Sequence, residues 1–211
     1  NLHVSITDSS REHEDEISMR IILATDNSHK LEELSAVLPD SLNLVPQGEL
    51  GISTPEETGL TFVENAIIKA RHASRISGLP AIADDSGLEV KYLKGAPGIY
   101  SSRYAGEHAS DAENNSKLLV ALNGVQGDAR SATFQCIIVF LQHYNDPTPI
   151  IASGSWNGRI LQQAKGTSGF GYDPIFQPLG LETTAAELSS TEKNQLSHRA
   201  KALDVLRGMI V

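Results

Sequence analysis

Two adjacent acids, Asp84 and Asp85, are the residues of this sequence whose types and spacing are best suited to chemistry. They follow the apolar run 81–83, and an alternating pattern resumes after Gly87, which predicts that both carboxylates lie at the mouth of a buried strand. Burying an ionised carboxylate is costly, so the pair needs a cation, a hydrogen-bond donor or water. A divalent metal ion would meet this need. The alternative is a solvated polar cap, in which Ser86 and Gly87 only make the turn.

A phosphate site is predicted where the first apolar run ends. Residues 20–25 predict a strand, and a helix follows the polar turn 25–30. Such a turn presents unpaired backbone N–H groups and the positive end of a helix dipole, and Lys30 adds a full positive charge. It is not a Walker loop, because the glycines and the Gly-Lys-Ser/Thr ending are missing. The alternative is a capped helix with an exposed lysine. The apolar positions of this helix are Leu31, Leu34, Val37 and Leu38.

Charged residues around a third segment could also join a site. Glu56 and Glu57 precede a helix predicted for residues 62–77, and Asn65 and Lys69 lie four residues apart on that helix. This spacing makes Asn65 and Lys69 neighbours on one face. The alternatives are an ordinary solvated face and two acids that only complement the helix dipole.

A glycine-rich loop with two aromatic residues lies further along the chain, at 166–174. Its glycines allow the backbone to approach a planar ligand closely, and Phe170 offers a ring for stacking, although buried aromatics anchoring a turn would give the same pattern. Ser197 is predicted to cap the last helix. His198 and Arg199 then fall in its first turn, where positive charge opposes the helix dipole unless an anion or polar ligand binds there.

Alternating strands and helices carry these segments. Thr61 and Glu64 have the spacing of a capping box at the start of the 62–77 helix. Two β-rich segments, 132–143 and 149–156, predict a long antiparallel hairpin, because an Asn-Asp-Pro turn joins them. The other predicted elements are a strand at 42–45, a turn-rich loop at 95–104, a helix at 111–122, a short helix at 184–188 and an amphipathic helix through Met209.

Composition limits the class of protein. A chain of 211 residues with 40% apolar content suits one domain or two closely merged lobes. A formal charge of -9 argues against polymeric nucleic acid as a partner, because coating phosphates needs a cationic stripe. No apolar run approaches the roughly 20 residues of a membrane span, and no signal-peptide pattern appears. The single cysteine, Cys136, is predicted to be a buried core thiol, as in a reducing cytoplasm.

The first 19 residues differ from the rest of the chain. Residues 1–19 are polar, acidic and without periodicity, which predicts an N-terminal extension outside the fold. Met19 is a candidate for the natural start. The fold is therefore expected to occupy residues 20–211.

Six motifs occur along the chain in a characteristic order. They are Ala24-Thr25-x-Asn27-x-x-Lys30, Glu56-Glu57-Thr58-Gly59-x-Thr61-Phe62-x-Glu64-Asn65-Ala66, Ala83-Asp84-Asp85-Ser86-Gly87-Leu88, Gly95-Ala96-Pro97-Gly98-Ile99-Tyr100-Ser101, Gly169-Phe170-Gly171-Tyr172-Asp173-Pro174 and Ser197-His198-Arg199. Together they resemble the inosine triphosphate pyrophosphatase family, the house-cleaning hydrolases of non-canonical purine nucleoside triphosphates. The similarity covers nearly everything from Arg20 to Leu206, and the bacterial branch of the family is the closer match.

The resemblance implies an α/β fold with an elongated central mixed β-sheet flanked by helices. It also implies two lobes within one domain, with an active-site cleft between them, and a homodimer in the cytoplasm. The implied reaction is the Mg²⁺-dependent hydrolysis of dITP, ITP or XTP to the nucleoside monophosphate and pyrophosphate, which cleanses the nucleotide pool. The partner would thus be a small-molecule nucleoside triphosphate.

The resemblance further implies roles for individual residues. Asp85 would be catalytic, and Glu56 and Asp85 would bind the metal. The substrate-binding residues would be Thr25, Asp26, Asn27, Ser28, His29, Lys30, Lys69, Ser86, Phe170, Gly171, Tyr172, Asp173, Lys193, His198 and Arg199. The triphosphate would lie at the turn 25–30 and Lys69, and the purine would stack on Phe170. The base would be read by Lys193, His198 and Arg199.

Hydrogen-bond donors in a binding site are suited to recognising a 6-oxo purine. Hypoxanthine and xanthine carry an acceptor at position 6, whereas adenine carries an amino donor, so a site built from donors rejects adenine. Guanine shares the 6-oxo group, and its exclusion must come from the 2-amino position. One departure from the family pattern is Asp26, where glycine is frequent. An acid beside a triphosphate is repulsive unless it points away or caps the following helix.

Two other functions stay open at this point. One is a nucleotide-binding regulator without turnover, against which the Glu56 and Asp85 pair argues, since binding alone does not need both metal ligands. The other is a different phosphohydrolase or a nucleotide kinase. The products would distinguish these, because pyrophosphate with a monophosphate supports the resemblance, whereas orthophosphate with a diphosphate contradicts it.

Overall fold

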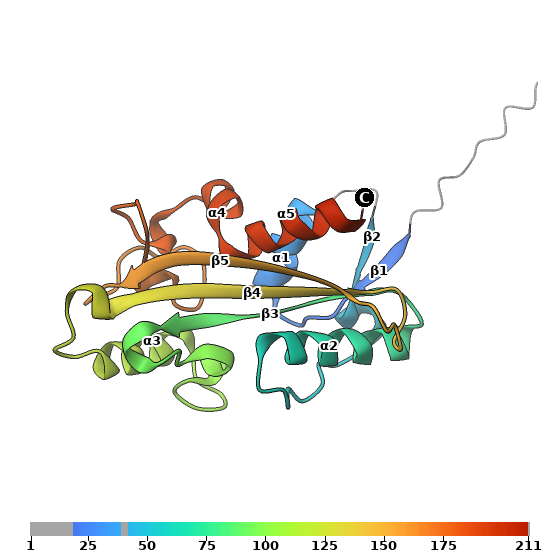
Figure 1. Ribbon diagram of the computed structural model, residues 1–211, viewed down its shortest axis with the longest axis horizontal. Helices are drawn as coiled ribbons and strands as arrows, with labels where there is room; N and C mark the ends of the chain where they lie inside the picture. Colours follow the sequence, from blue (N-terminus) through green and yellow to red (C-terminus); the bar gives the residue numbers. More distant parts are fainter. Residues whose placement is uncertain (1–18, 39–41, 211) are drawn as a thin grey trace, which may run out of the picture.

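Six strands form one mixed sheet in the order β2-β1-β3-β4-β5-β6 in the computed structural model, which describes residues 19–38 and 42–210 (Figure 1). The strands are β1 (Arg20–Leu23), β2 (Asn43–Pro46), β3 (Ala81–Val90), β4 (Ser131–Leu141), β5 (Ile150–Ile160) and β6 (Phe176–Pro178). β1 pairs in parallel with β2 and β3, and the remaining neighbours are antiparallel. The predicted mixed sheet is therefore confirmed.

Helices cover both faces of the sheet. In Figure 1, α1, α4 and α5 lie on one face, and α2 and α3 lie on the other. The α-helices are α1 (Ser28–Val37), α2 (Phe62–Ser77), α3 (Asp111–Ala121), α4 (Ser190–Leu196) and α5 (His198–Ile210). Short 3-10 helices are η1 (Gln47–Leu50), η2 (Lys91–Leu93), η3 (Gly98–Arg103), η4 (Gly127–Arg130), η5 (Asp173–Ile175) and η6 (Ala185–Glu187).

The hairpin of β4 and β5 makes the sheet elongated. Each strand has 11 residues, and the register runs from Ser131 opposite Arg159 to Phe140 opposite Ile150. At about 3.4 Å per residue, the hairpin is roughly 37 Å long. It therefore connects the parallel end of the sheet, where α2 and α5 pack, with the distal end near α3.

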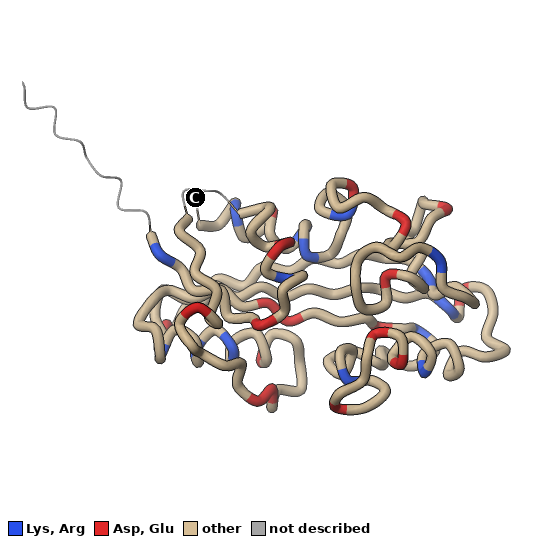
Figure 2. Tube along the Cα trace, turned by 180° about the vertical axis from the view of Figure 1, so that it is seen from behind, with Lys and Arg blue, Asp and Glu red and all other residues tan. Residues whose placement is uncertain are grey.

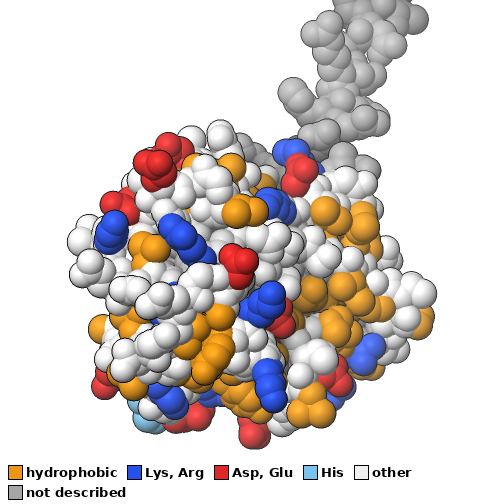
Figure 3. All heavy atoms as spheres, turned by 60° about the vertical axis from the view of Figure 1, so that its left-hand side comes forward, with side chains coloured by type: hydrophobic (Ala, Val, Ile, Leu, Met, Phe, Trp, Pro, Cys, Tyr) orange, Lys and Arg blue, Asp and Glu red, His pale blue; other side chains and the backbone are white. Residues whose placement is uncertain are grey.

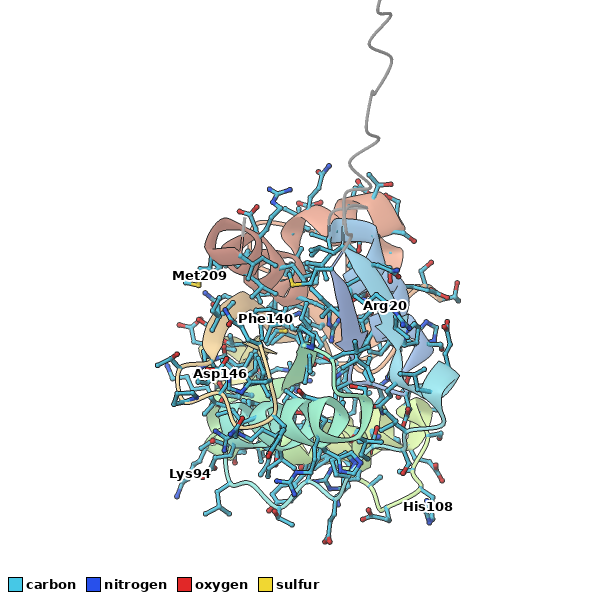
Figure 4. The ribbon with its side chains drawn as sticks, turned by 90° about the vertical axis from the view of Figure 1, so that its right-hand side faces the viewer. Arg20, Lys94, His108, Phe140, Asp146 and Met209 are labelled. Atoms are coloured by element: carbon cyan, nitrogen blue, oxygen red, sulfur yellow. The ribbon has the colours of Figure 1, made fainter. Side chains whose placement is uncertain are left out.

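At the parallel end of the sheet, alternate side chains of the strands pack into two separate hydrophobic cores, one on each face. Ile21 and Ile22 are adjacent on β1, and because successive side chains point to opposite faces, Ile21 joins the core under α1 and α5 while Ile22 joins the core under α2. The α2 core is lined by small side chains, including Ala66 and Ala70, which let that helix approach the sheet. Figure 4 shows Phe140 in the interior of the molecule.

A third core fills the distal end of the sheet. Three of its buried aromatic rings, Phe134, Trp156 and Phe176, come from β4, β5 and β6, and the ring centroids of Phe134 and Phe176 lie 4.6 Å apart. Tyr172 and Leu118 of α3 belong to the same cluster. The aromatic cluster fixes the far end of the hairpin, near the 170–173 loop.

Gly154 on β5 permits close packing of the C-terminal helix. A Cβ at this position would lie 2.1 Å from the carbonyl oxygen of His198 and 2.5 Å from the backbone nitrogen of Ala202. No real Cβ tolerates such distances, so any side chain here would push α5 away from the sheet. The glycine thus sets the position of the helix that carries His198 and Arg199.

Most predicted elements agree with the structure, with four differences. The short helix predicted at 184–188 is the 3-10 helix η6, neither α4 nor β6 was predicted, and β3 runs without interruption through the two acids. Thr61 caps α2 as expected, accepting a hydrogen bond from the Glu64 backbone N–H at 3.3 Å. The expected N-terminal extension lies, apart from Met19, outside the described residues.

The described surface carries mixed charge. Figure 2 shows Lys and Arg positions interspersed with Asp and Glu along the trace, and Figure 3 shows the same mixture among apolar side chains on one face. No helix in the described part of the chain is long and apolar enough to span a membrane. Cys136 is a free, buried thiol on β4, as predicted, and burial raises its pKa to about 12.

Candidate active site

A cavity of about 400 Å³ gathers segments that lie far apart in the sequence. The predicted residues that line it are Thr25, Asp26, Asn27, Lys30, Lys69, Asp85, Ser86, Phe170, Gly171, Tyr172, Asp173, Lys193, His198 and Arg199. Among residues that were not predicted, Thr54, Glu57 and Asp111 also line the cavity. Ser28, His29 and Glu56 were predicted to belong to the site and do not line the cavity.

The turn between β1 and α1 forms one wall of the cavity. The Asn27 side chain caps α1 by accepting a hydrogen bond from the Lys30 backbone N–H at 3.1 Å, and the Asn27 N–H donates to Thr25 Oγ1 at 3.2 Å. Lys30 Nζ lies 2.9 Å from Asp84 Oδ2. This ion pair keeps the lysine on the cavity wall. The alternative of a capped helix with an exposed lysine is therefore correct for the cap and wrong for the lysine.

The two acids of β3 point to opposite faces of the sheet. Because the strand is continuous, the expected strand mouth and turn at this position are wrong. Asp84 pairs with Lys30 and Arg199 on the side of α1 and α5, and Asp85 pairs with Lys69 on the side of α2. Both acids are buried, with 1% and 6% of their surfaces exposed. The cations explain how a strand can hold two carboxylates in its interior.

The two carboxylates differ in their affinity for a proton. Burial alone would raise the pKa of Asp84, but the positive charges of Lys30, Arg199 and Lys69 outweigh it and hold the pKa well below its ordinary value. For Asp85 burial prevails over Lys69, and the pKa is raised. Asp85 Oδ2 is buried and has no hydrogen-bond partner among the described residues. Asp84 Oδ1 is likewise buried without a hydrogen-bond partner among these residues, but of the two acids only Asp85 lines the cavity. Asp84 is therefore a fixed anion behind the cavity wall, whereas Asp85 lines the cavity and has an oxygen available to accept a proton or bind a cation.

Lys69 connects Asp85 to a glutamate that sequence analysis did not assign. Lys69 Nζ lies 2.8 Å from Asp85 Oδ1 and 2.7 Å from Glu57 Oε1, and Glu57 Oε2 lies 3.4 Å from Arg103 Nη1. Glu57 lines the cavity, whereas its neighbour Glu56, the expected metal ligand, is exposed and outside it. The segment has no strand or helix periodicity, so the sequence could not show which of the two side chains faces inward.

The oxygen atoms at this end of the cavity fit a magnesium ion. Within the described residues, no group of three or more His, Cys, Asp or Glu side chains could hold a metal ion by itself. Mg²⁺ needs only one or two carboxylates when phosphates and waters complete its octahedron. Asp85 supplies a buried oxygen without a hydrogen-bond partner among the described residues, and Glu57 binds the same ammonium group as Asp85, that of Lys69. The donor set thus suits Mg²⁺ that arrives with phosphate ligands.

Phe170 stands on a loop shaped by glycine. Gly169 has a φ of +75°, and a Cβ there would lie 2.1 Å from Asp173 Oδ2, so this position excludes a side chain. The same Asp173 oxygen accepts a hydrogen bond from the Phe170 backbone N–H at 3.0 Å. The ring of His29 stacks on Phe170 with centroids 5.1 Å apart and planes 8° from parallel. His29 therefore contacts the stacking ring without lining the cavity.

Side chains from other elements hold the aromatic loop in place. Asp111 Oδ2 accepts a hydrogen bond from the Gly171 N–H at 2.6 Å, and Asn115 Nδ2 donates to the Gly171 carbonyl at 3.0 Å. The buried Tyr172 donates its hydroxyl proton to the Ser101 carbonyl at 2.8 Å. The predicted alternative of a turn anchored by a buried aromatic is correct for Tyr172, while Phe170 remains on the cavity wall.

Glu33 of α1 binds two cationic residues of the cavity wall, a contact that the sequence did not predict. Lys193 Nζ lies 3.0 Å from Glu33 Oε1 and 2.7 Å from Asp173 Oδ2. Arg199 contacts the other Glu33 oxygen, and its Nη2 lies 3.3 Å from Asp84 Oδ2. Burial alone would raise the pKa of Glu33, but Arg199 and Lys193 outweigh it and lower the pKa. Glu33 is thus an anion that holds Lys193 and Arg199 side by side.

The expected charge at the start of α5 needs a correction. Ser197 accepts a hydrogen bond from the Ala200 N–H at 3.1 Å, as a cap should. Burial lowers the pKa of His198 well below its ordinary value, so the imidazole is neutral, and it stacks on Phe134 with centroids 4.8 Å apart. The charge of Arg199 is compensated by carboxylates. The first turn therefore does not oppose the helix dipole with two positive charges.

Known proteins similar to this chain share one description. The family model described as the Ham1 family matches residues 21–209. The dITP/XTP pyrophosphatase of Salmonella typhimurium is 56% identical over 188 residues, covering 89% of this chain and 95% of that relative. The dITP/XTP pyrophosphatase of Escherichia coli O157:H7 is 55% identical with the same coverage.

Solved structures agree with this similarity. The structure of a HAM1 protein from Coxiella burnetii has a TM-score of 0.85 and 50% identity, and the match covers 91% of this chain and 98% of that one. The Staphylococcus aureus Ham1 protein has a TM-score of 0.81 and 40% identity, over 90% of this chain and 97% of that one. The similarity thus extends over about nine tenths of this chain.

Proposed function

The chain belongs to the Ham1 family, and on this premise we propose that it hydrolyses the non-canonical purine nucleoside triphosphates dITP, ITP and XTP to the nucleoside monophosphate and pyrophosphate. It is a nucleoside triphosphate pyrophosphohydrolase, like its relatives of 55% and 56% identity. One observation carries the proposal. A single cavity brings Asp85, Lys69 and Lys30 together with Phe170 and Lys193, which supplies a triphosphate end and a purine end.

Two lysines and a helix start would bind the triphosphate. An ammonium group has three N–H donors. Lys30 Nζ has one carboxylate partner, Asp84, and Lys69 Nζ has two, Asp85 and Glu57, so both retain donors for phosphate oxygens. The N-terminus of α1 adds backbone N–H groups and the positive end of its dipole. These groups would match the negative charge of the triphosphate and of the departing pyrophosphate.

Asp85 is the proposed catalytic residue. Lys69 fixes Oδ1, so the carboxylate is oriented, and Oδ2 is left to accept a proton from the attacking water as the new oxygen–phosphorus bond forms. We propose Mg²⁺ as the cofactor, held by Asp85 with Glu57 on the present geometry and with Glu56 on the family resemblance. When bound, Mg²⁺ neutralises charge on the phosphate oxygens.

The purine end would select a 6-oxo base through donors. Phe170 offers the stacking surface, and Lys193 Nζ lies 4.6 Å from its ring centroid. Two of the three Lys193 donors face Glu33 and Asp173, which leaves one for a ligand. Arg199 also lines the cavity and keeps one Nη1 N–H that Glu33, Asp84 and Ser86 do not engage. A 6-oxo group accepts from these donors, whereas the 6-amino group of adenine would leave them unpaired.

The domain organisation, oligomeric state and localisation of the enzyme are proposed from the family resemblance. We propose that residues 20–211 act as one two-lobed domain with the cleft between the lobes, and that residues 1–19 lie outside it. We further propose a homodimer in the cytoplasm that removes deaminated nucleotides from the pool and has no polymeric nucleic-acid partner. Light scattering during size-exclusion chromatography would test the dimer, since a mass near 23 kDa would contradict it.

The reaction itself is tested by a panel of substrates with products resolved. Purified protein with Mg²⁺ would be incubated with dITP, ITP, XTP, dATP and dGTP. We expect pyrophosphate and a monophosphate from the first three, at a kcat/KM at least about 100-fold above that for dATP. Orthophosphate with a diphosphate would show another phosphohydrolase, and binding without turnover would show a regulator. Either result would overturn the proposal.

A further inference from the structure

Asp26 stands in the phosphate turn, where a negative charge beside a triphosphate would be repulsive. Both of its carboxylate oxygens are engaged by two other residues. Oδ1 accepts from Gln47 Nε2 at 2.7 Å, and Oδ2 accepts from the Thr54 backbone N–H at 3.0 Å and from Thr54 Oγ1 at 2.6 Å. Gln47 Nε2 also donates to Thr54 Oγ1 at 2.7 Å. We call Asp26, Gln47 and Thr54 the Asp26 clamp.

The Asp26 clamp rests on a rigid part of the fold. Gln47 opens η1 directly after strand β2, and only 1% of its surface is exposed. The Ile52 N–H donates to the Gln47 carbonyl at 3.1 Å, which fixes the chain just before Thr54. Burial alone would raise the pKa of Asp26, but the hydrogen bonds from Thr54 and Gln47 lower it. The clamp therefore contains a carboxylate that is ionised at neutral pH and saturated by donors.

Residues 53–58 carry Glu57, which lines the cavity, and its exposed neighbour Glu56, and few other bonds hold this segment. Among the described residues, the segment forms hydrogen bonds or ion pairs at two points only. Thr54 binds to the Asp26 clamp, and Glu57 binds to Lys69 and Arg103. Asp26 is thus the direct link between the turn 25–30 and this segment.

We propose that Asp26 is a positioning residue that ties the phosphate turn to residues 53–58, so that their carboxylates and the phosphate-binding cations face one Mg²⁺–triphosphate. This inference rests on the proposed function, and it changes the role expected for Asp26 from the sequence. The side chain does not bind substrate. It holds the acidic segment in register with Lys30 and the start of α1.

Two roles for Asp26 predict opposite changes in the KM for dITP when the side chain is removed. If its charge only repelled the triphosphate, Asp26→Ala would lower KM for dITP. If it positions residues 53–58, Asp26→Ala would raise KM and the Mg²⁺ concentration for half-maximal rate, each about tenfold, because three hydrogen bonds to a charged group are lost. The kcat at saturating substrate and Mg²⁺ should stay within about threefold, since Asp85 and Lys69 are untouched.

The experiment is steady-state kinetics with dITP and Mg²⁺ on Asp26→Ala, three related variants and one control variant. Asp26→Asn removes the charge but keeps one acceptor, so it should lie between wild type and Asp26→Ala. Thr54→Val should move both constants in the same direction, and the double variant Asp26→Ala/Thr54→Val should be non-additive because both changes break one cluster. Asp128→Ala is the matched control, since Asp128 is exposed on η4 and removes the same charge outside the cavity.

Each outcome decides the proposal. A KM or Mg²⁺ requirement for Asp26→Ala that is lower than or equal to that of wild type would overturn the positioning role, as would equal effects in Asp128→Ala. If the variant loses stability, calorimetry with inorganic triphosphate and Mg²⁺ on the folded protein replaces kinetics, and unchanged affinity would likewise overturn it. A wild-type protein that is inactive on dITP would refute the proposed function instead.

Discussion

Asp85→Asn is the most informative single change, because it alters one oxygen of a residue whose surroundings are known in detail. Asparagine can keep its oxygen towards Lys69, preserving the bond now measured at 2.8 Å to Oδ1. Its amide nitrogen takes the place of Oδ2, the buried oxygen without a partner. The substitution therefore removes the proton acceptor and one metal-binding oxygen while leaving the orientation of the side chain intact.

The expected loss is large in rate and small in stability. Removing a positioned general base costs a factor of about 10²–10⁴ in kcat, or roughly 3–5 kcal/mol in the activation barrier. Folding should change little, for two reasons. Lys69 keeps Glu57 as a partner at 2.7 Å. In addition, the raised pKa of Asp85 shows that the fold disfavours its ionised form, so a neutral side chain is tolerated.

Asp84→Asn is the matched control, because it is the same chemical change one residue away on the opposite face. It leaves Lys30 and one side of Arg199 without a buried counter-charge, which costs about 3–5 kcal/mol of folding free energy. At roughly 2–4 °C per kcal/mol, the Tm should fall by about 6 °C or more.

The assay measures kcat on dITP and the Tm of both variants. A kcat for Asp85→Asn within threefold of wild type would remove Asp85 from the mechanism. A fall in Tm for Asp85→Asn as large as that of Asp84→Asn would show that the two acids are equivalent structural anions, and would exclude the different roles proposed for them.

Five further results are expected. Lys193→Met should lower kcat/KM on dITP about 10- to 100-fold and leave that on dATP nearly unchanged, because only the 6-oxo base uses the remaining donor; parallel kinetics would check this. The pKa of Asp85 is raised, so kcat should fall as the pH drops through a value above the ordinary 3.8, which a pH–rate profile would show. The pKa of Asp84 is lowered, so its stabilisation is present above pH 3.8 and lost as the pH falls further; urea unfolding at pH 7 and pH 3 should show less acid destabilisation in Asp84→Asn than in wild type. Gly154→Ala should cost about 1–3 kcal/mol and lower the Tm, because its Cβ meets the α5 backbone. Chelation with EDTA should abolish turnover, and added Mg²⁺ should restore it.

Local patterns in the sequence were sufficient for most of the fold. Apolar runs located β1 and the β4–β5 hairpin, and Thr61 with Glu64 located the start of α2. Ser189 and Glu192 form a capping box at the start of α4, a signal of the same kind that could have revealed this missed helix. Where a cap or an alternating pattern decides the structure, neighbouring residues carry the information.

Partners distant in sequence decide the parts that were wrong or missed. The pattern suggested that Asp84 and Asp85 lie at the mouth of a strand, because a strand cannot bury two acids unaided. The cations that allow it, Lys30 and Arg199 for one acid and Lys69 for the other, come from three separate helices.

Glu33 illustrates the same limit within one helix. It lies one turn after Lys30 on α1, and helical spacing alone could have placed it on the same face. Its ion pairs depend on Lys193 and Arg199, which lie far along the chain, so helical spacing could not predict them. Most of the cavity wall followed from the family resemblance, whereas the contacts that position it required the structure.

A crystal structure with Mg²⁺ and a non-hydrolysable dITP analogue would show where the purine and the phosphates bind. We expect the purine stacked on Phe170, its 6-oxo group within hydrogen-bond distance of Lys193 Nζ, and the phosphate chain running to Lys30 and Lys69 with Asp85 beside the scissile bond. A purine bound away from Phe170, or phosphates out of reach of Asp85, would exclude the proposed use of this cavity.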